Sequence, residues 1–441
     1  MTVIQPEPIP ATAGGELNPS HFVGRRAATI RIRQMLENGQ HIRLADPWRM
    51  GKTSWLRWFE ASCTDDRWLQ VKVISYTGLN SIRQFVERTV EGLAEIDAMP
   101  EAFLDYLRGL FDGLAPDGAD GPVRFRMSLP GDEGSALKLM DGIVRTLDKT
   151  LGGRTDARPL VLGLDEVPDV ILAMLRAGRT ADGRNMLDRM RLWRANSRRL
   201  RWIIAGSIGL HHVLELAGVS RAAVNDLQPV SFGPLEPAEA EELVQRLVRG
   251  LGRRIEPAAT ASLIERTGAI PHLIQSLAAR LRYDEHDMTT IGPITPAEVV
   301  SRFTAYIQDR DQSVAPAQLV ARIRHDYGPD APLAFAILDA TLGVTGQHEP
   351  APGAATQSGL AEGSPGATTP PGQPGPARLM PTPKTAGQLR AAVMATDRFD
   401  AVLNALVEDH YLIAVERGRE FAWRYPALRA IYHERRAPWR Q

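Results

Sequence analysis

A glycine–lysine turn at Gly51 and Lys52 is the feature that most restricts how this sequence can fold. Gln40–Ala45, directly before the turn, has the length and pattern of a short buried strand. Thr53–Ser62, directly after it, places its apolar residues on one face of a helix. A helix that begins at such a turn directs free N–H groups and the positive end of its dipole outward, where they bind anions. We therefore expect a strand, a phosphate-binding loop and a helix in direct succession.

The turn matches the phosphate-loop pattern Gly-x-x-x-x-Gly-Lys-Ser/Thr except at its first position, where Asp46 replaces glycine. In such a loop the glycine lets the backbone approach the phosphates, the lysine reaches their oxygens, and the hydroxyl of Thr53 holds Mg²⁺. Asp46 can adopt the left-handed turn that glycine usually provides, but its carboxylate adds negative charge near the phosphates and predicts weaker binding. The alternative is that Gly-Lys-Thr only begins a helix. The residues of the predicted loop are Asp46, Pro47, Trp48, Arg49, Met50, Gly51, Lys52, Thr53 and Ser54.

Strands alternate with helices over residues 20–230. Leu69–Tyr76 alternates apolar and polar side chains like a strand, and Pro159–Leu164 is an apolar run too short for a helix, as expected for a buried parallel strand. Arg201–Ala205 is a further predicted strand. This order predicts an α/β fold with a doubly wound parallel sheet. The predicted helices are Ala27–Asn38, which precedes the first strand, and Ser81–Leu93, Ala136–Leu151 and Asn185–Asn196, which lie between later strands. Ala115–Glu133 is predicted to be a surface excursion.

Two of these strands end in residues suited to phosphate chemistry. Asp165 and Glu166 follow the apolar run, where Asp165 would hold the magnesium shell through water and Glu166 would orient an attacking water. Ser207 follows the strand Arg201–Ala205 and would hydrogen-bond the γ-phosphate or a water. The alternatives are an acidic pair that ends a strand in solvent and a serine that only forms a turn.

Two further segments would complete a nucleotide pocket. One precedes the first helix, where apolar side chains would flank adenine and a glycine allows a tight turn; its residues are Phe22, Val23, Gly24 and Arg25. In the other, Pro271 would begin a helix at its favoured first position and His272 would face the nucleotide. A lone histidine at a helix start is more often a surface residue.

Changes in composition and periodicity divide the chain into six predicted segments. The strands disappear after the core, and amphipathic helices predict a helical lid. A long stretch rich in Pro, Gly, Ala, Thr and Ser predicts a disordered linker, and the helix, helix and hairpin beyond it predict a winged-helix-like domain. The segments are a flexible N-terminus at 1–19, the core at 20–234, the lid at 235–310, connecting helices with the first winged-helix helix at 311–342, the linker at 343–385 and the winged-helix-like domain at 386–441.

Charge and cysteine content limit the partners and the compartment. Equal counts of 52 acidic and 52 basic residues give no overall attraction to nucleic acid or to a membrane surface, so any such binding must be local. The only cysteine is Cys63, which leaves no intrachain disulfide and favours a reducing compartment. No run of about 18 apolar residues predicts a membrane span. We expect a cytoplasmic protein that does not bind membranes.

Taken in order, these motifs resemble the STAND and AAA+-like ATPases, and most of all the prokaryotic ATPase-domain group that ends in a winged helix. The resemblance covers about residues 20–310 and more faintly 330–435. It implies that ATP with Mg²⁺ lies between sheet and lid, that nucleotide exchange moves the lid and the winged helix, and that hydrolysis is slow and regulatory. By the same resemblance Lys52 and Thr53 take the phosphate and magnesium roles, Asp165 the second magnesium role, Glu166 the catalytic position and Ser207 that of a sensor.

Three functions are compatible with these features: a nucleotide-dependent regulatory switch, an ATP-dependent DNA-binding initiator or transposition-type helper, and a nucleotide-holding scaffold without turnover. The second would use residues 386–441 to bind DNA, while a protein-docking module or self-association is the alternative for the same residues. Trp423 and Tyr425 are as compatible with a core as with base stacking. No arginine finger is assigned, because several arginines share one predicted solvated helix face: Arg189, Arg191, Arg194, Arg198 and Arg199.

Overall fold

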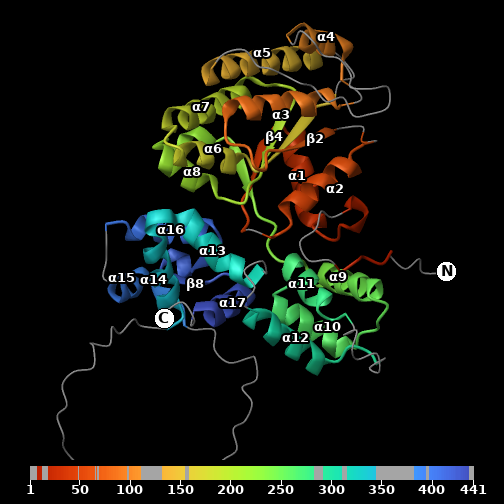
Figure 1. The fold of residues 1–441 in the computed structure, drawn as a ribbon, viewed down its shortest axis with the longest axis vertical. Helices are drawn as coiled ribbons and strands as arrows, with labels where there is room; N and C mark the ends of the chain where they lie inside the picture. The colour runs from red at the N-terminus through yellow and green to blue at the C-terminus, as the bar shows by residue number, and fades with distance from the viewer. Residues whose placement is uncertain are drawn as a thin grey trace, which may run out of the picture.

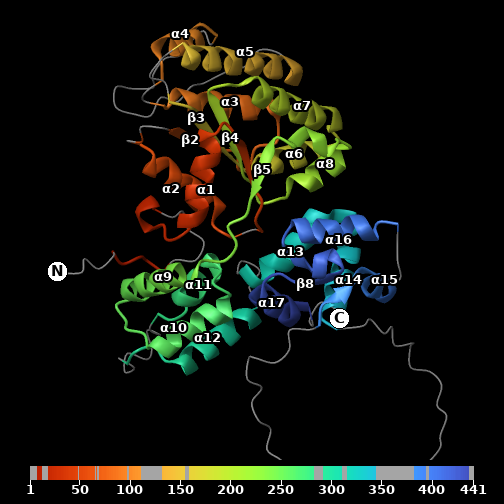
Figure 2. The same cartoon turned by 180° about the vertical axis from the view of Figure 1, so that it is seen from behind.

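The computed structural model describes residues 7–11, 18–47, 49–64, 66, 69–96, 99–110, 132–153, 158–282, 292–309, 315–343, 382–393 and 397–436. They form an α/β core, a helical lid and a C-terminal domain. Both views show the lid and the C-terminal domain side by side against the same end of the core (Figures 1 and 2). Trp48, most of the predicted linker and most of the predicted surface excursion lie outside the described residues. Within the described part, no helix is long and apolar enough to cross a membrane.

The core is built on a five-stranded parallel sheet in the order β2-β3-β4-β1-β5. This confirms the predicted doubly wound parallel sheet. The edge strand β5 was not predicted, because it is short and contains Pro229, a residue that a sheet accepts at its edge but not at its centre. The strands are β1 (His41–Leu44), β2 (Gln70–Ser75), β3 (Leu160–Asp165), β4 (Leu200–Ile204) and β5 (Leu227–Val230).

Helices cover both faces of this sheet. On β3, Val161 packs towards α1 (Arg26–Glu37) and α2 (Lys52–Ser62), whereas its neighbours Leu160 and Leu162 pack on the opposite face. Side chains of a strand alternate between the two faces, so a strand buried on both sides is apolar throughout. The opposite face carries α3 (Ile82–Ala94), α4 (Glu101–Leu110), α5 (Glu133–Gly152), α6 (Val167–Arg176), α7 (Thr180–Asn196) and α8 (Leu210–Ala217).

One buried histidine of strand β1 gives the core a defined response to acid. The Nδ1 atom of His41 accepts a hydrogen bond from the backbone N–H of Trp202 at 3.3 Å, so the ring must be neutral there. Burial, with Arg194 nearby, lowers the pKa of His41 from 6.5 to about 4. The His41 ring takes up a proton near pH 6.5 in the unfolded chain but only near pH 4 in the folded chain. Its contribution to the unfolding free energy is therefore fully present above pH 6.5 and is lost as the pH falls from 6.5 to 4.

We expect acidification from pH 6.5 to 4 to remove on the order of 3 kcal/mol of unfolding free energy through His41 alone. Urea unfolding of the wild type and of His41→Asn across this range checks the prediction. The asparagine can still accept the Trp202 N–H but does not titrate, so its acid-dependent loss is expected to be smaller. An equal loss in both proteins would assign the acid response to other groups.

The lid consists of four helices that each begin with proline, a residue favoured at the first helical position because its missing N–H has no partner there. Ile9, in the described part of the predicted flexible N-terminus, is buried against this lid and donates its backbone N–H to the Arg246 carbonyl at 3.1 Å. Gly250 makes this approach possible, because a Cβ there would lie 2.0 Å from the Ile9 carbonyl oxygen. The helices are α9 (Pro237–Gly250), α10 (Pro257–Thr267), α11 (Pro271–Ala279) and α12 (Pro296–Gln308).

The C-terminal domain combines helices with a three-stranded sheet in the order β6-β8-β7. Its succession of helix, strand, two helices and hairpin is consistent with a winged-helix-like domain. Lys384–Thr385 form β6, so the end of the predicted linker belongs to this sheet. The remaining elements are α13 (Ala315–Tyr327), α14 (Ala331–Thr341), α15 (Ala386–Ala392), α16 (Phe399–Glu408), β7 (Leu412–Val415), β8 (Glu420–Trp423) and α17 (Pro426–Arg436).

Candidate functional site

Three neighbouring strands bring the predicted site residues to one edge of the sheet. Because β3, β4 and β1 are adjacent and parallel, the residues that follow them emerge side by side. Asp165 ends β3, Ser207 follows β4, and the loop from Asp46 to Gly51 follows β1. Ligands of parallel α/β sheets bind outside the carboxyl ends of the strands. This edge faces the lid and the C-terminal domain (Figure 1).

The loop after β1 is shaped by left-handed backbone conformations at Arg49 (φ 69°) and Gly51 (φ 88°). A left-handed Gly51 lets α2 begin directly at Lys52. The Lys52 ammonium donates to the backbone carbonyls of Asp46 at 2.6 Å and Pro47 at 3.0 Å. Burial lowers the pKa of Lys52, and Asp46, Glu166 and Asp165 oppose this shift. The lysine is thus held inside its own loop at the start of a helix.

Asp46 does not act as a substitute for a left-handed glycine, because the left-handed residues in the described part of the loop are Arg49 and Gly51. Its carboxylate accepts three hydrogen bonds from the segment after β5: from the hydroxyl of Ser231 at 2.7 Å, from the N–H of Phe232 at 2.7 Å and from the N–H of Gly233 at 3.1 Å. This segment leads into the lid. Asp46 therefore fastens the loop to the connection between core and lid.

We expect Asp46→Gly, which restores the usual loop glycine, to destabilise the protein rather than to improve its phosphate loop. Loss of three hydrogen bonds to a buried carboxylate would lower the unfolding free energy by on the order of 3 kcal/mol. Urea unfolding measures this loss. Ser231→Ala, which removes one donor, is the matched variant and is expected to cost about 1 kcal/mol. A glycine variant as stable as the wild type would contradict this role of Asp46.

The carboxylates after β3 form a connected polar group with Ser207. Asp165 is buried and accepts a hydrogen bond from the hydroxyl of Thr53; burial and the neighbouring Glu166 raise its pKa. Glu166 has a left-handed conformation (φ 63°) and accepts the backbone N–H of Ser207 at 2.8 Å. Burial raises the pKa of Glu166 to about 7, and Asp169 adds to the shift. Neither carboxylate simply ends a strand in solvent.

A pocket of about 440 Å³ lies at this edge, within the size range of ligand sites. It brings together most of the predicted site residues: Phe22, Val23, Arg25, Arg49, Met50, Gly51, Lys52, Thr53, Ser54, Asp165, Glu166, Ser207, Pro271 and His272. Asp46 and Pro47 instead line a smaller cavity on the other side of the loop. The sequence analysis missed four lining residues that belong to no motif: His21, Arg57, Leu243 and Gln275.

Gly24, Arg25 and His272, which were predicted to belong to the site, are not simple surface residues. Gly24 (φ 88°) does not line the pocket and is needed where the chain passes Leu235, since a Cβ there would lie 2.7 Å from that side chain. Arg25 is buried and donates to the carbonyls of Met50 at 3.1 Å and Pro234 at 2.8 Å, which joins the loop to the start of the lid. Burial, with Arg49 nearby, lowers the pKa of His272 to about 3, so its ring is neutral at pH 7.

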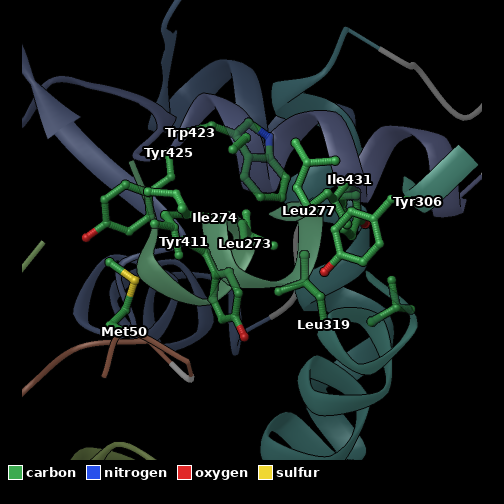
Figure 3. Packing of buried hydrophobic residues seen from close by; sticks show 14 of the residues in the cluster. Met50, Leu273, Ile274, Leu277, Tyr306, Leu319, Tyr411, Trp423, Tyr425 and Ile431 are labelled. Atoms are coloured by element: carbon green, nitrogen blue, oxygen red, sulfur yellow. The ribbon is translucent and has the colours of Figure 1, made fainter. Parts of the chain in front are cut away.

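Met50 extends from the phosphate loop into a hydrophobic core shared by the lid and the C-terminal domain. It is 1% exposed and belongs to the same buried cluster as Leu273 of the lid and Tyr411 and Tyr425 of the C-terminal domain. Figure 3 shows these side chains around one space, with Met50 entering from the loop. Beside it, the Arg49 guanidinium donates to Gln318 of α13 at 3.3 Å. The loop therefore contacts both other parts of the molecule.

One arginine that was expected on a solvated helix face is buried, and another arginine, outside that group, contacts Ser207. Arg194 of α7 is buried and donates to Asp226 at 2.6 and 2.9 Å, so it supports the core. Arg322 of α13 donates to the hydroxyl of Ser207 and to Asp326, at 3.1 Å for the latter. No sequence motif marks Arg322, because its partner lies 115 positions away in the chain.

Comparison with known proteins establishes the fold. No family model and no curated protein matches this sequence. Among solved structures, the Walker-type ATPase PABY2304 of Pyrococcus abyssi is similar at 13% identity and a TM-score of 0.53, over 93% of this chain and 96% of that chain. The chain has a P-loop NTPase fold. Two further solved structures are similar in fold. They are the Aeropyrum pernix ORC2 protein in its ADPNP and ADP complexes (12% identity, TM-score 0.46, 95% and 97% coverage) and the Thermotoga maritima RuvB Holliday junction branch migration motor (13%, 0.35, 90% and 92%).

Proposed function

We propose that this protein binds ATP with Mg²⁺ and uses the nucleotide as a regulatory switch with slow hydrolysis. The observation that carries the proposal is the convergence of Lys52, the buried Asp165, the partly buried Glu166 and Ser207 on one pocket of ligand size. The same pocket is bounded by the lid through Pro271 and His272. A nucleotide there would touch core and lid together.

The phosphate end of the pocket fits ATP and Mg²⁺ by its donor groups. The backbone N–H groups at the start of α2 face the phosphates, and Lys52 exchanges its two carbonyl partners for phosphate oxygens. Thr53 and Asp165, already joined by a hydrogen bond, supply the hydroxyl and carboxylate oxygens that Mg²⁺ prefers. An ion held by Thr53 and Asp165 would supply positive charge beside the phosphates. His21 and Phe22 lie at the rim beside the first helix, where the base would be held.

Glu166 is proposed to orient the attacking water and to accept its proton. Its raised pKa, about 7, makes it a stronger base than an ordinary carboxylate while leaving much of it ionised at neutral pH. The N–H of Ser207 holds one of its oxygens at 2.8 Å. Arg322 of the C-terminal domain donates a hydrogen bond to the Ser207 hydroxyl. The proposed base is thereby connected to a domain that would move when ATP is exchanged for ADP.

Magnesium-dependent calorimetry of ATP on the full chain tests the binding proposal. We expect one saturable site with Mg²⁺ and ATP, and weaker binding without the ion. Absence of binding at millimolar nucleotide would exclude the proposed function. Hydrogen exchange of the amides of α13 with ATP and then ADP tests the switch, since Gln318 and Arg322 there contact the loop and Ser207. Identical hydrogen exchange with ATP and with ADP would contradict the switch and favour the nucleotide-holding scaffold.

A protein partner or self-association is the better-supported role of the C-terminal domain, with DNA binding as the alternative. Trp423 and Tyr425 are each 5% exposed and pack in the shared core, so they are not free to stack on bases. At the hairpin turn Arg417 and Arg419 are exposed beside Glu416. Retention of the full chain on DNA that weakens steeply with salt would favour the DNA role.

A further inference from the structure

Two histidines of the core and one carboxylate of the C-terminal domain meet at a second site, outside the nucleotide pocket. His211 and His212 begin α8, and Asp409 follows α16 directly. The histidines are 7% and 8% exposed, and the aspartate side chain is 13% exposed. Neither element has a role in the proposed nucleotide chemistry.

The three side chains direct their ligand atoms at one point. One nitrogen of each histidine and one oxygen of Asp409 all lie within 4.8 Å of one another, the only such group found among the described residues. His212 Nε2 lies 2.7 Å from Asp409 Oδ2, and His211 Nε2 lies 3.4 Å from Asp409 Oδ1. Two imidazoles and a carboxylate, completed by a water as fourth ligand, are a donor set that zinc uses.

A second layer of side chains orients these ligands. A carboxylate oxygen of Glu408 lies 3.3 Å from Nδ1 of His211, where it can accept a hydrogen bond from a protonated Nδ1. In that tautomer Nε2 carries no proton, and its lone pair is available to a metal ion. Tyr327 donates its hydroxyl to Asp409 Oδ2 at 2.8 Å. Carboxylates and hydroxyls that hold the ligands in this way are characteristic of metal sites in proteins.

An ion pair alone leaves part of this cluster unsatisfied. The buried Nε2 atom of His211 has no hydrogen-bond partner, although its neighbour His212 is well placed on Asp409. The two rings lie 4.2 Å apart between centroids, so protonation of both would place two positive charges side by side, offset by Asp409 and, at His211, by Glu408. A divalent cation would satisfy both nitrogens and the carboxylate at once.

We propose that His211, His212 and Asp409 form a zinc site that ties the C-terminal domain to the core. Its ligands come from α8 on one side and from the end of α16 on the other, so the complete site exists only while the two parts are docked. Zinc would then stabilise this arrangement by binding it alone. His211, His212 and Asp409 do not line the pocket proposed for the nucleotide, and the zinc proposal does not rest on the function proposed above.

The test is calorimetric titration of Zn²⁺ alone into the full chain, freed of metal by a chelator and without nucleotide. We expect one tight site in the wild type. His211→Gln and His212→Gln should each weaken it by more than about 100-fold, and Glu408→Gln, which keeps all three ligands, by about 10- to 100-fold. His433→Gln, on the exposed side of α17, is the matched control and should bind zinc as the wild type does.

Replacement of zinc by Co²⁺ gives a second measurement on the unaltered protein, in case a variant fails to fold. A tetrahedral nitrogen and oxygen site predicts intense visible absorption bands on the wild type. Equal zinc affinity in the wild type and the two histidine variants, or a folded wild type that binds neither metal tightly, would overturn the proposal and leave His212 and Asp409 as an ion pair.

Discussion

Replacing Lys52 by alanine is expected to abolish detectable ATP binding while leaving the fold intact. Lys52 is the first residue of α2, and the two present partners of its ammonium are backbone carbonyls of the same loop. Loss of its contacts to the β- and γ-phosphates removes charge-assisted hydrogen bonds in a buried site, each worth about 1.5–3 kcal/mol. We therefore expect the dissociation constant to rise by about 100-fold or more.

The measurement is calorimetry of wild type and Lys52→Ala with the same magnesium and nucleotide concentrations, after urea unfolding has shown that both are folded. Lys72→Ala is the control, because Lys72 forms a partly exposed ion pair with Glu95 away from the pocket. Its affinity should match that of the wild type. Unchanged binding in Lys52→Ala would mean that nucleotide, if bound, does not use this loop.

Replacing Glu166 by glutamine is expected to lower ATP turnover by about 100- to 10,000-fold without weakening ATP binding. The glutamine is isosteric and its amide oxygen can still accept the Ser207 N–H, so the geometry of the site is kept. It cannot accept a proton from water. The raised pKa of Glu166, about 7, indicates how strongly this position differs from an exposed carboxylate.

Single-turnover hydrolysis, measured beside calorimetric binding, separates the two effects. Glu91→Gln, at a surface ion pair with Arg88, is the matched control and should hydrolyse ATP at the wild-type rate. Equal turnover in Glu166→Gln and wild type would remove Glu166 from the reaction. A wild type that binds ATP but shows no turnover would instead favour the scaffold function.

The local part of the site could be predicted from sequence because its geometry is fixed over short stretches of chain. A strand, Gly51-Lys52 and a helix specify the direction of the loop, and parallel pairing then places Asp165 and Ser207 beside it. Helices α6 and α8 were not predicted, because at 10 and 8 residues they offer only about two to three turns in which a helical period could be recognised.

The contacts of the site between residues far apart in the sequence could not be predicted from periodicity. The carboxylate of Asp46 finds its partners at Ser231–Gly233, and Arg322 finds Ser207. Aspartate in place of the usual glycine weakens the match to the loop motif. The structure explains this aspartate by its hydrogen bond from Ser231, which lies 185 positions further along the chain. Nothing in the spacing of the loop motif indicates that partner.

The position of Met50 has a consequence for the heat of nucleotide exchange. A loop that closes on phosphates and opens again must move a side chain that is packed among Leu273, Tyr411 and Tyr425. Exposure or burial of that apolar surface changes the heat capacity of the solution. ATP binding and ADP release should thus have enthalpies that vary with temperature more steeply than phosphate contacts alone would give.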